Sequence, residues 1–272
     1  MQALRLTASW PVDSVAATVV RPDGSIDTIG DQQRRFRIAS VAKTLTTWAC
    51  LVAVEEGTVA LDQPIGQPGC TLRHLLCHAG GYGFDGTTPI AKPERTRIYS
   101  NTGIEMAADA VATAAGMSFA DYLDEAVLRP LGMTQTELNG SPAHRMWSSA
   151  ADLTRFALEI RAPRLIATTT AEDAESVQFP ALNGVIPGVG KYSPCPWGLG
   201  FEIRGDKQPH WTGTTNSPRT FGHFGGAGTF LWVDPAVGVA CIALTDRRFD
   251  DWADEALRAW PAFSDAVLAE VA

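Results

Sequence analysis

The chain has 272 residues, of which 45% are hydrophobic and 19% are charged, and its formal net charge is -8 at pH 7. This balance is typical of a folded globular protein with a sizeable core and excludes a disordered or fibrous chain. The negative charge argues against a nucleic-acid surface, and the short basic run at 34–37 is too small to change that.

The first part of the chain predicts a hairpin followed by a long buried helix. Strands at 15–20 and 25–29 flank a Pro-Asp-Gly turn. A short segment at 35–38 then leads into an apolar helix at 40–56, which Gly57 ends. Apolar side chains wrap much of this helix, which indicates a central position in the core.

Helical patterns dominate the middle of the chain, from about 61 to 194. The predicted helices cover residues 71–78, 101–115, 118–128 (ended by Pro130) and 149–161. Periodicity fades between 162 and 196, so loops are expected there.

The last part of the chain returns to strands. We predict strands at 198–203, 229–233 and 239–245, and a final helix at 250–260 that continues past a break at Pro261 to about 271. The polar stretch 205–219 is the longest candidate for a flexible loop.

Strands at both ends around a helical middle predict an α+β fold. The N- and C-terminal segments would pair in one antiparallel sheet flanked by helices, with an all-helical lobe inserted between them. We expect a single domain over 1–272, with an α/β lobe at about 1–60 and 195–272 and a helical lobe at about 61–194. A cleft between the lobes is the expected site.

The sequence shows no clear targeting segment, and its cysteines show no disulfide or metal-binding pattern. No run of 18 apolar residues occurs, and the N-terminus lacks the charged start and apolar block of a signal peptide. We therefore expect no membrane span and a cytoplasmic location, although a chain trimmed of its leader would look the same. The cysteines are odd in number and follow no metal spacing, which favours reduced, mostly buried thiols: Cys50, Cys70, Cys77, Cys195 and Cys241.

The most informative motif is Ser40-Val41-Ala42-Lys43 at the start of the first helix. Residues three apart share a helix face, so Lys43 can reach the Ser40 hydroxyl and help to deprotonate it. The alternative is a serine that caps the helix and a lysine that is simply solvated.

Two further motifs follow in chain order. Tyr99-Ser100-Asn101 places a phenol and a carboxamide at a helix start, where a packed loop tyrosine is the alternative. His223-Phe224-Gly225-Gly226 precedes a strand pair, and its glycines let a ligand approach the backbone. The segment His78-Ala79-Gly80 has the same His-x-Gly pattern, and only order and strand context favour His223.

Other kinds of site have less support. His74 and His78 are four apart and could bind a metal with Cys77, but a structural role is favoured. The sequence has no Gly-x-Ser-x-Gly elbow, phosphate loop or dinucleotide fingerprint. We therefore predict neither a metal nor an organic cofactor.

Taken together, these motifs resemble the serine β-lactamase and penicillin-binding-protein family, on its class C side with the related family VIII carboxylesterases. That family combines Ser-x-x-Lys, then Tyr-x-Asn, then Lys- or His-x-Gly on a strand at the sheet edge. The likeness extends through most of the chain, including the segments 72–81, 129–133 and 197–201.

The resemblance implies an acyl-enzyme on Ser40, with Lys43 and Tyr99 moving the proton. Lys43 would favour the phenolate of Tyr99, and either group could be the base. Backbone N–H groups of Ser40 and Gly226 would form the oxyanion hole, beside Gly225. Asn101 would hold Lys43 or bind the acyl side chain, and His223 would touch the substrate or Tyr99.

Departures from the family pattern point to the substrate. His223 stands where many penicillin-recognising members have lysine, so recognition of a substrate carboxylate should weaken. The resemblance therefore implies a serine hydrolase of small esters or amides. The alternatives are β-lactamase or D-alanyl peptidase activity on small β-lactam or peptide substrates, or a catalytically silent ligand-binding protein of the same fold.

Overall fold

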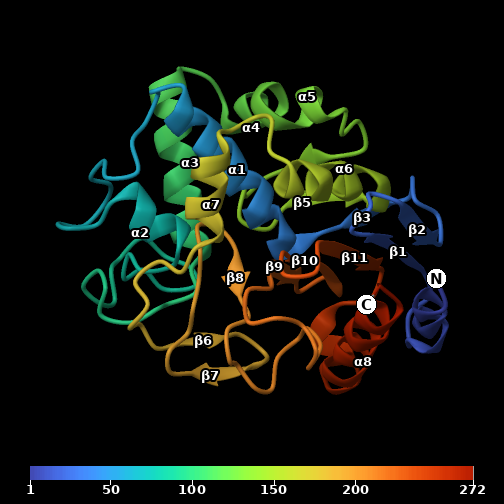
Figure 1. Ribbon diagram of the computed structural model, residues 1–272. Coiled ribbons are helices and arrows are strands. Elements are labelled where there is room, and N and C mark those ends of the chain that lie inside the picture. Colours follow the sequence, from blue (N-terminus) through green and yellow to red (C-terminus); the bar gives the residue numbers. More distant parts are fainter. Residues whose placement is uncertain (272) are drawn as a thin grey trace.

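A six-stranded antiparallel sheet organises the computed structural model, which describes residues 1–271 (Figure 1). In spatial order its strands are β2 (Ile26–Ile29), β1 (Val15–Val20), β11 (Val239–Thr245), β10 (Thr229–Asp234), β9 (Phe221–Gly225) and β8 (Glu202–Ile203). The mixed helix and sheet architecture confirms the predicted α+β class.

The N- and C-terminal parts of the chain meet in the centre of this sheet. β1 pairs with β11 over its whole length, from Val15 opposite Thr245 to Val20 opposite Ala240. β1 also forms the predicted hairpin with β2. These two strands lie more than 200 residues apart in the chain. Their pairing confirms the prediction that the N- and C-terminal segments share one antiparallel sheet.

Helices cover both faces of the sheet (Figure 1). One face packs against α8 (Ala253–Val271) and the N-terminal 3-10 helix η1 (Ala3–Ser9), through a core that includes Trp260 and Phe263. The other face packs against α1 (Ala42–Glu55) and α6 (Ala150–Arg161). Twelve of the 14 residues of α1 are buried, as its apolar circumference predicts.

The remaining helices lie mainly between α1 and α6 in the chain. They are α2 (Leu72–Leu76), α3 (Asn101–Ala115), α4 (Phe119–Leu123), the π-helical turn η3 (Asp124–Leu128), α5 (Arg129–Leu131) and, after α6, α7 (Thr168–Glu175). The prediction that Pro130 ends a helix is wrong, because Pro130 lies in the first turn of α5, where no amide donor is required. Gly132, at a φ of 67°, ends the helix instead.

The inserted segment is not all-helical, which corrects the prediction. β5 (Met146–Ser149) pairs with β4 (Glu137–Leu138) and with β3 (Arg35–Arg37) in a second sheet. Within the expected loop at 162–196 lie α7 and a hairpin of β6 (Gly184–Ile186) and β7 (Gly190–Tyr192). These strands have only two to four residues, too few for alternation to reveal them.

Three predictions near the C-terminus also need correction. Of the strand expected at 198–203, only β8 forms. His223 lies within strand β9 rather than before the strands. The last helix starts after a 3-10 turn, η4 (Phe249–Asp251), and runs through Pro261 without interruption, since its apolar face is buried against the sheet.

All five cysteines are free and buried, in agreement with the prediction. Within residues 1–271, no helix combines the length and apolarity needed to cross a bilayer. The same range contains no group of three or more His, Cys, Asp or Glu side chains arranged to hold a metal ion. His74 instead meets Glu94, with 2.9 Å between Nε2 and Oε1, and stacks on Phe179.

Candidate active site

Ser40 lies on a tight turn between β3 and α1. A one-turn 3-10 helix, η2 (Ala39–Val41), carries it, and the preceding Ala39 has a φ of 45°. This left-handed backbone is costly for a residue with a Cβ, and such strain is common where a side chain must be presented to a ligand. The Ser40 side chain is partly exposed and lines the cleft described below.

Strand β9 packs directly against this turn. A Cβ on Gly225 would overlap the carbonyl oxygen of Ile38, so only glycine fits there. Thr229 Oγ1 donates a hydrogen bond to the same oxygen over 3.0 Å. At Gly226, by contrast, a Cβ would meet no atom within 4 Å, because this residue faces open space in the cleft. The strand and the turn therefore hold the backbones of Ser40 and Gly226 on one cleft wall.

Lys43 is the buried centre of the site. Its side chain is fully buried, and its Nζ lies 3.2 Å from Ser40 Oγ, 2.7 Å from Asn101 Oδ1 and 2.9 Å from the carbonyl oxygen of Ala143. Removal from water lowers the pKa of Lys43 to about 7, although the charges of Glu105 and Asp85 oppose that shift. A large fraction of the amine is therefore neutral at pH 7.

Tyr99 reaches the same point from the start of α3. The Lys43 ammonium lies 4.7 Å from the centre of the Tyr99 ring, and the ring packs on His78 and Trp197. Removal from water raises the pKa of Tyr99, against the effect of the neighbouring Ser40 hydroxyl. The expectation that Lys43 favours the phenolate is therefore wrong for the free protein, because burial acts on both groups and keeps the phenol neutral.

His223 accepts a hydrogen bond from the Tyr99 hydroxyl. Its Nδ1 lies 2.6 Å from the carbonyl oxygen of Phe224, so we assign the proton to Nδ1. Nε2 is then an acceptor for the Tyr99 hydroxyl over 3.3 Å. Burial, with a smaller contribution from Lys43, lowers the pKa of His223 to about 3. His223 thus brings a neutral acceptor to the position where the family pattern often has a lysine charge.

Asn101, the first residue of α3, fixes the position of Lys43. Its Oδ1 accepts from Lys43 Nζ, and its Nδ2 donates to Asp85 Oδ1 over 3.3 Å. The helix start itself is held by Ser100, whose Oγ accepts from the Gly103 amide over 2.9 Å. Of the two roles expected for Asn101, the structure shows the contact with Lys43.

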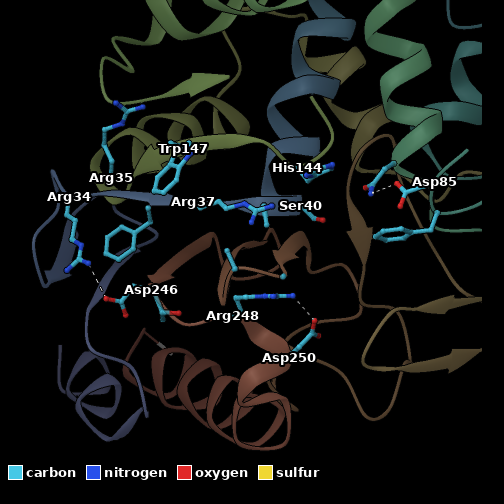
Figure 2. Close-up of a pocket in the computed structure, with 17 residues that line it drawn as sticks. Arg34, Arg35, Arg37, Ser40, Asp85, His144, Trp147, Asp246, Arg248 and Asp250 are labelled. Carbon is cyan, nitrogen blue, oxygen red and sulfur yellow. Dashed lines mark hydrogen bonds and ion pairs between the residues drawn. The ribbon is translucent and has the colours of Figure 1, made fainter. Parts of the chain in front are cut away.

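The cleft at Ser40 has two compartments of different character. The wide compartment has a volume of about 680 Å³ and the narrow one about 210 Å³. Ser40, Phe84, Gly226 and Asp250 line both. Figure 2 shows the wide compartment, with Ser40 at its inner side and arginines on β3 and after β11.

The family model for beta-lactamase matches residues 14–262, which is most of the chain. The chain belongs to the beta-lactamase family. This confirms the resemblance seen in the sequence motifs. Ser40 and Lys43, which share one motif, and Tyr99, which lies much further along the chain, meet at one point of the family fold as described above.

Comparisons with individual proteins agree with the family. The structure superimposes on the crystal structure of a beta-lactamase from Mycobacterium bovis with a TM-score of 0.96 and 49% identity, over 99% of each chain. A simvastatin synthase variant from Aspergillus terreus shares the fold, with a TM-score of 0.80 and 18% identity over 99% of this chain and 97% of that one.

Two curated relatives match over a shorter region. Penicillin-binding protein 4* of Bacillus subtilis is 26% identical over 136 residues, which are 38% of this chain and 30% of that protein. The D-alanyl-D-alanine-carboxypeptidase/endopeptidase AmpH of Escherichia coli K12 is 27% identical over 143 residues, which are 39% of this chain and 37% of that protein. The matches thus span about a third of the length of these relatives.

Sequence reasoning missed a buried charged network beside the narrow compartment. Glu202 lines this compartment and is paired with Lys207, His210 and Trp211; its Oε2 lies 2.8 Å from His210 Nε2 and 2.8 Å from Trp211 Nε1. Burial opposes ionisation of Glu202, but the charges of His210 and Lys207 outweigh it and lower the pKa to about 2. A glutamate between Phe201 and Ile203 was the available signal.

This network changes the interpretation of the polar stretch 205–219. The backbone is irregular as predicted, but Lys207, Trp211 and Asn216 are buried. Trp211 is one wall of the narrow compartment. The stretch is therefore anchored in the protein and shapes the site, rather than lying free in solvent.

Proposed function

We propose that this protein is a serine hydrolase that forms an acyl-enzyme on Ser40 and acts on small carboxylic esters or amides. The proposal rests on one observation above all. The Lys43 amine, fully buried and with a pKa of about 7, lies 3.2 Å from the Ser40 hydroxyl. A largely neutral amine at that distance can accept the serine proton at physiological pH.

In the proposed acylation, Ser40 Oγ attacks the substrate carbonyl carbon and its proton passes to Lys43 Nζ. The carbonyl oxygen becomes an oxyanion held by the backbone N–H groups of Ser40 and Gly226. When the tetrahedral intermediate collapses, the bond to the leaving oxygen or nitrogen breaks and that atom takes a proton. Tyr99 supplies this proton from its neutral phenol and regains one from Lys43.

Deacylation repeats these steps with water in place of the serine. Lys43 takes a proton from the water molecule that attacks the acyl carbon, and it gives this proton to the Ser40 oxygen when the ester bond to the acyl group breaks. No metal or organic cofactor takes part in this scheme, since a base, an acid and two amide donors are sufficient.

The lack of a positive charge on His223 supports the preference for esters and simple amides, since the carboxylates of Glu202 and Asp250 also line the leaving-group side. The narrow compartment next to Tyr99 is lined by aromatic groups and by His223, whose pKa of about 3 leaves it uncharged at pH 7. A substrate carboxylate on this side would find no fixed positive charge from His223. The cytoplasmic location remains a prediction from the sequence.

A second candidate is β-lactam hydrolysis. The 49% identity to a protein described as a beta-lactamase favours it, and the acylation groups would be the same. D-alanyl peptidase activity, which the name of AmpH describes, is a further variant of this chemistry.

Labelling with a fluorescent alkyl phosphonate tests the central proposal. We expect one covalent adduct on Ser40, and no adduct in Ser40→Ala at equal folded concentration. Absence of labelling in the native protein would favour a silent binding protein of this fold. Where labelling occurs, kcat/KM for para-nitrophenyl butyrate against a chromogenic cephalosporin separates the two enzyme candidates, and a larger value for the cephalosporin would overturn the esterase preference.

A further inference from the structure

The wide compartment carries a positive side chain that the proposed chemistry does not use. Arg37 and Trp147 are directly paired residues on β3 and β5, so both project from the same face of this small sheet. Both line the wide compartment, and Figure 2 shows the Arg37 side chain extending toward Ser40. Phe36, between the two exposed arginines of β3, is buried at the edge of the same compartment, under the Arg34 guanidinium.

Arg37 differs from the arginines around it because no carboxylate neutralises it. Arg34 pairs with Asp246 over 3.1 Å, Arg35 pairs with Glu137, and Arg248 lies 3.7 Å from Asp250. Within the described residues 1–271, Arg37 has no ion-pair partner. An uncompensated guanidinium in a concave site is a strong attractor for a planar carboxylate, which it can bind with two parallel hydrogen bonds.

Trp147 adds an apolar surface beside this charge. It is 42% exposed, whereas the other seven tryptophans of the chain are all buried. An aromatic wall next to an unpaired arginine suits a short alkyl chain that ends in an anionic group. Three aspartates also line this compartment, and each has another partner: Asp85 accepts from Asn101, Asp246 pairs with Arg34, and Asp250 lies near Arg248.

The position of Tyr99 decides which half of the substrate occupies this compartment. Ser40 and Gly226 line both compartments, so the reacting carbonyl belongs at their junction. Tyr99 lines only the narrow compartment, whereas Arg37 and Trp147 line only the wide one. Because the leaving group needs a proton from the Tyr99 side, it occupies the narrow aromatic compartment, and the acyl group extends toward Arg37.

We infer that the preferred substrates carry a carboxylate on the acyl group, as in monoesters or monoamides of dicarboxylic acids, with Arg37 binding the carboxylate and Trp147 the chain. This inference rests on the proposed acyl-enzyme chemistry at Ser40. It places the anionic group on the acyl side and an apolar group on the leaving side.

Two para-nitrophenyl esters with the same leaving group test the inference. One is the monoester of adipic acid, which is anionic at pH 7, and the other is its neutral methyl-capped counterpart. We expect kcat/KM to be about tenfold higher for the anionic ester, which is what one charge-assisted bidentate contact supplies. Added salt should reduce this ratio, because it screens the exposed guanidinium.

Variants of Arg37 test whether this residue causes the preference for the anionic ester. Arg37→Gln should lower the anionic-to-neutral ratio of kcat/KM by about tenfold, mainly through KM for the anionic ester. Arg37→Glu should reverse the preference. Arg5→Gln, which removes one exposed positive charge on η1 outside both compartments, should leave the ratio unchanged. Thermal melts of each variant establish that it is folded.

The outcomes separate this inference from the proposed function. Turnover of both esters with no preference, or equal losses for both in Arg37→Gln, would overturn the anionic acyl assignment and leave the hydrolase proposal intact. Failure of both esters together with absence of phosphonate labelling would overturn the hydrolase proposal itself.

Discussion

At the scale of single residues, burial rather than direct charge pairing sets the chemistry of the site. Desolvation lowers the pKa of Lys43 and raises that of Tyr99, so the neutral forms of both are favoured. In water a lysine would be charged and would be a poor base at neutral pH. The buried site thus makes the amine, and not the phenol, the group suited to accept the Ser40 proton.

The pH dependence of acylation follows from this assignment. Only neutral Lys43 can accept the serine proton, so kcat/KM for para-nitrophenyl butyrate should rise with pH through about 7, the pKa of Lys43, and level off above it. Lys43→Met should lower kcat/KM by about 100-fold or more and remove this limb. A rise centred near the pKa of a free phenol would instead identify Tyr99 as the base.

The role of the Tyr99 hydroxyl depends on the leaving group. Tyr99→Phe keeps the ring that packs beside Lys43 and His78 but removes the proton donor. We expect about a 100-fold loss of kcat for an ethyl ester, whose leaving group needs protonation, and a much smaller loss for a nitrophenyl ester. Equal losses for the two esters would show that the phenol acts on Ser40 and not on the leaving group.

At the scale of elements, four structural elements form the catalytic site: the turn η2, the first turn of α1 with Lys43, the start of α3 and the strand β9. Their alignment depends on close approach between β9 and the backbone before Ser40, where Gly225 meets Ile38. A His-x-Gly pattern alone did not separate His223 from His78. The structure separates them, since His78 is buried behind the Tyr99 ring and accepts from the Ser100 amide over 3.2 Å.

Substitution of Gly225 tests this close approach. In Gly225→Ala the new methyl group would push β9 away from the Ile38 carbonyl, so we expect a loss of about 1–3 kcal/mol in unfolding free energy and slower labelling of Ser40. Gly226→Ala is the matched control for stability, because its Cβ would meet no atom within 4 Å. Equal midpoints of urea unfolding for the two variants would contradict the argument.

At the scale of the whole molecule, the fold buries every cysteine thiol. Burial raises the pKa of Cys50 to about 12 and those of Cys70 and Cys77 to about 11, and it also raises the pKa of Cys195 and of Cys241. Thiolates, the reactive forms, are therefore scarce at neutral pH, and none of the five thiols is exposed to reagents.

Thiol titration tests this enclosure of the core. A chromogenic disulfide reagent should modify almost no cysteine in the native protein at pH 8 and all five after unfolding in guanidinium chloride. Reductant should leave the melting temperature unchanged, since no disulfide contributes to it. Rapid modification of one native thiol would show that part of this core opens readily.

The sequence by itself determined the fold class, the pairing of the chain ends and the candidate residues Ser40, Lys43 and Tyr99. These depend on local periodicity and on motifs with fixed spacing, which are visible in a single chain. The helix at 101–115 has the predicted bounds because Ser100 caps its start and Gly116 ends it.

Only the tertiary structure decided the protonation states, the short strands β4 to β7, the Glu202 network and the two compartments of the cleft. A pKa depends on desolvation by side chains from distant segments, and a two-residue strand forms only where a partner strand supplies its hydrogen bonds. The same holds for Arg37. The sequence shows the basic run at 34–37, but only the packed structure shows that Arg34 and Arg35 have carboxylate partners and that Arg37 has none within the described residues.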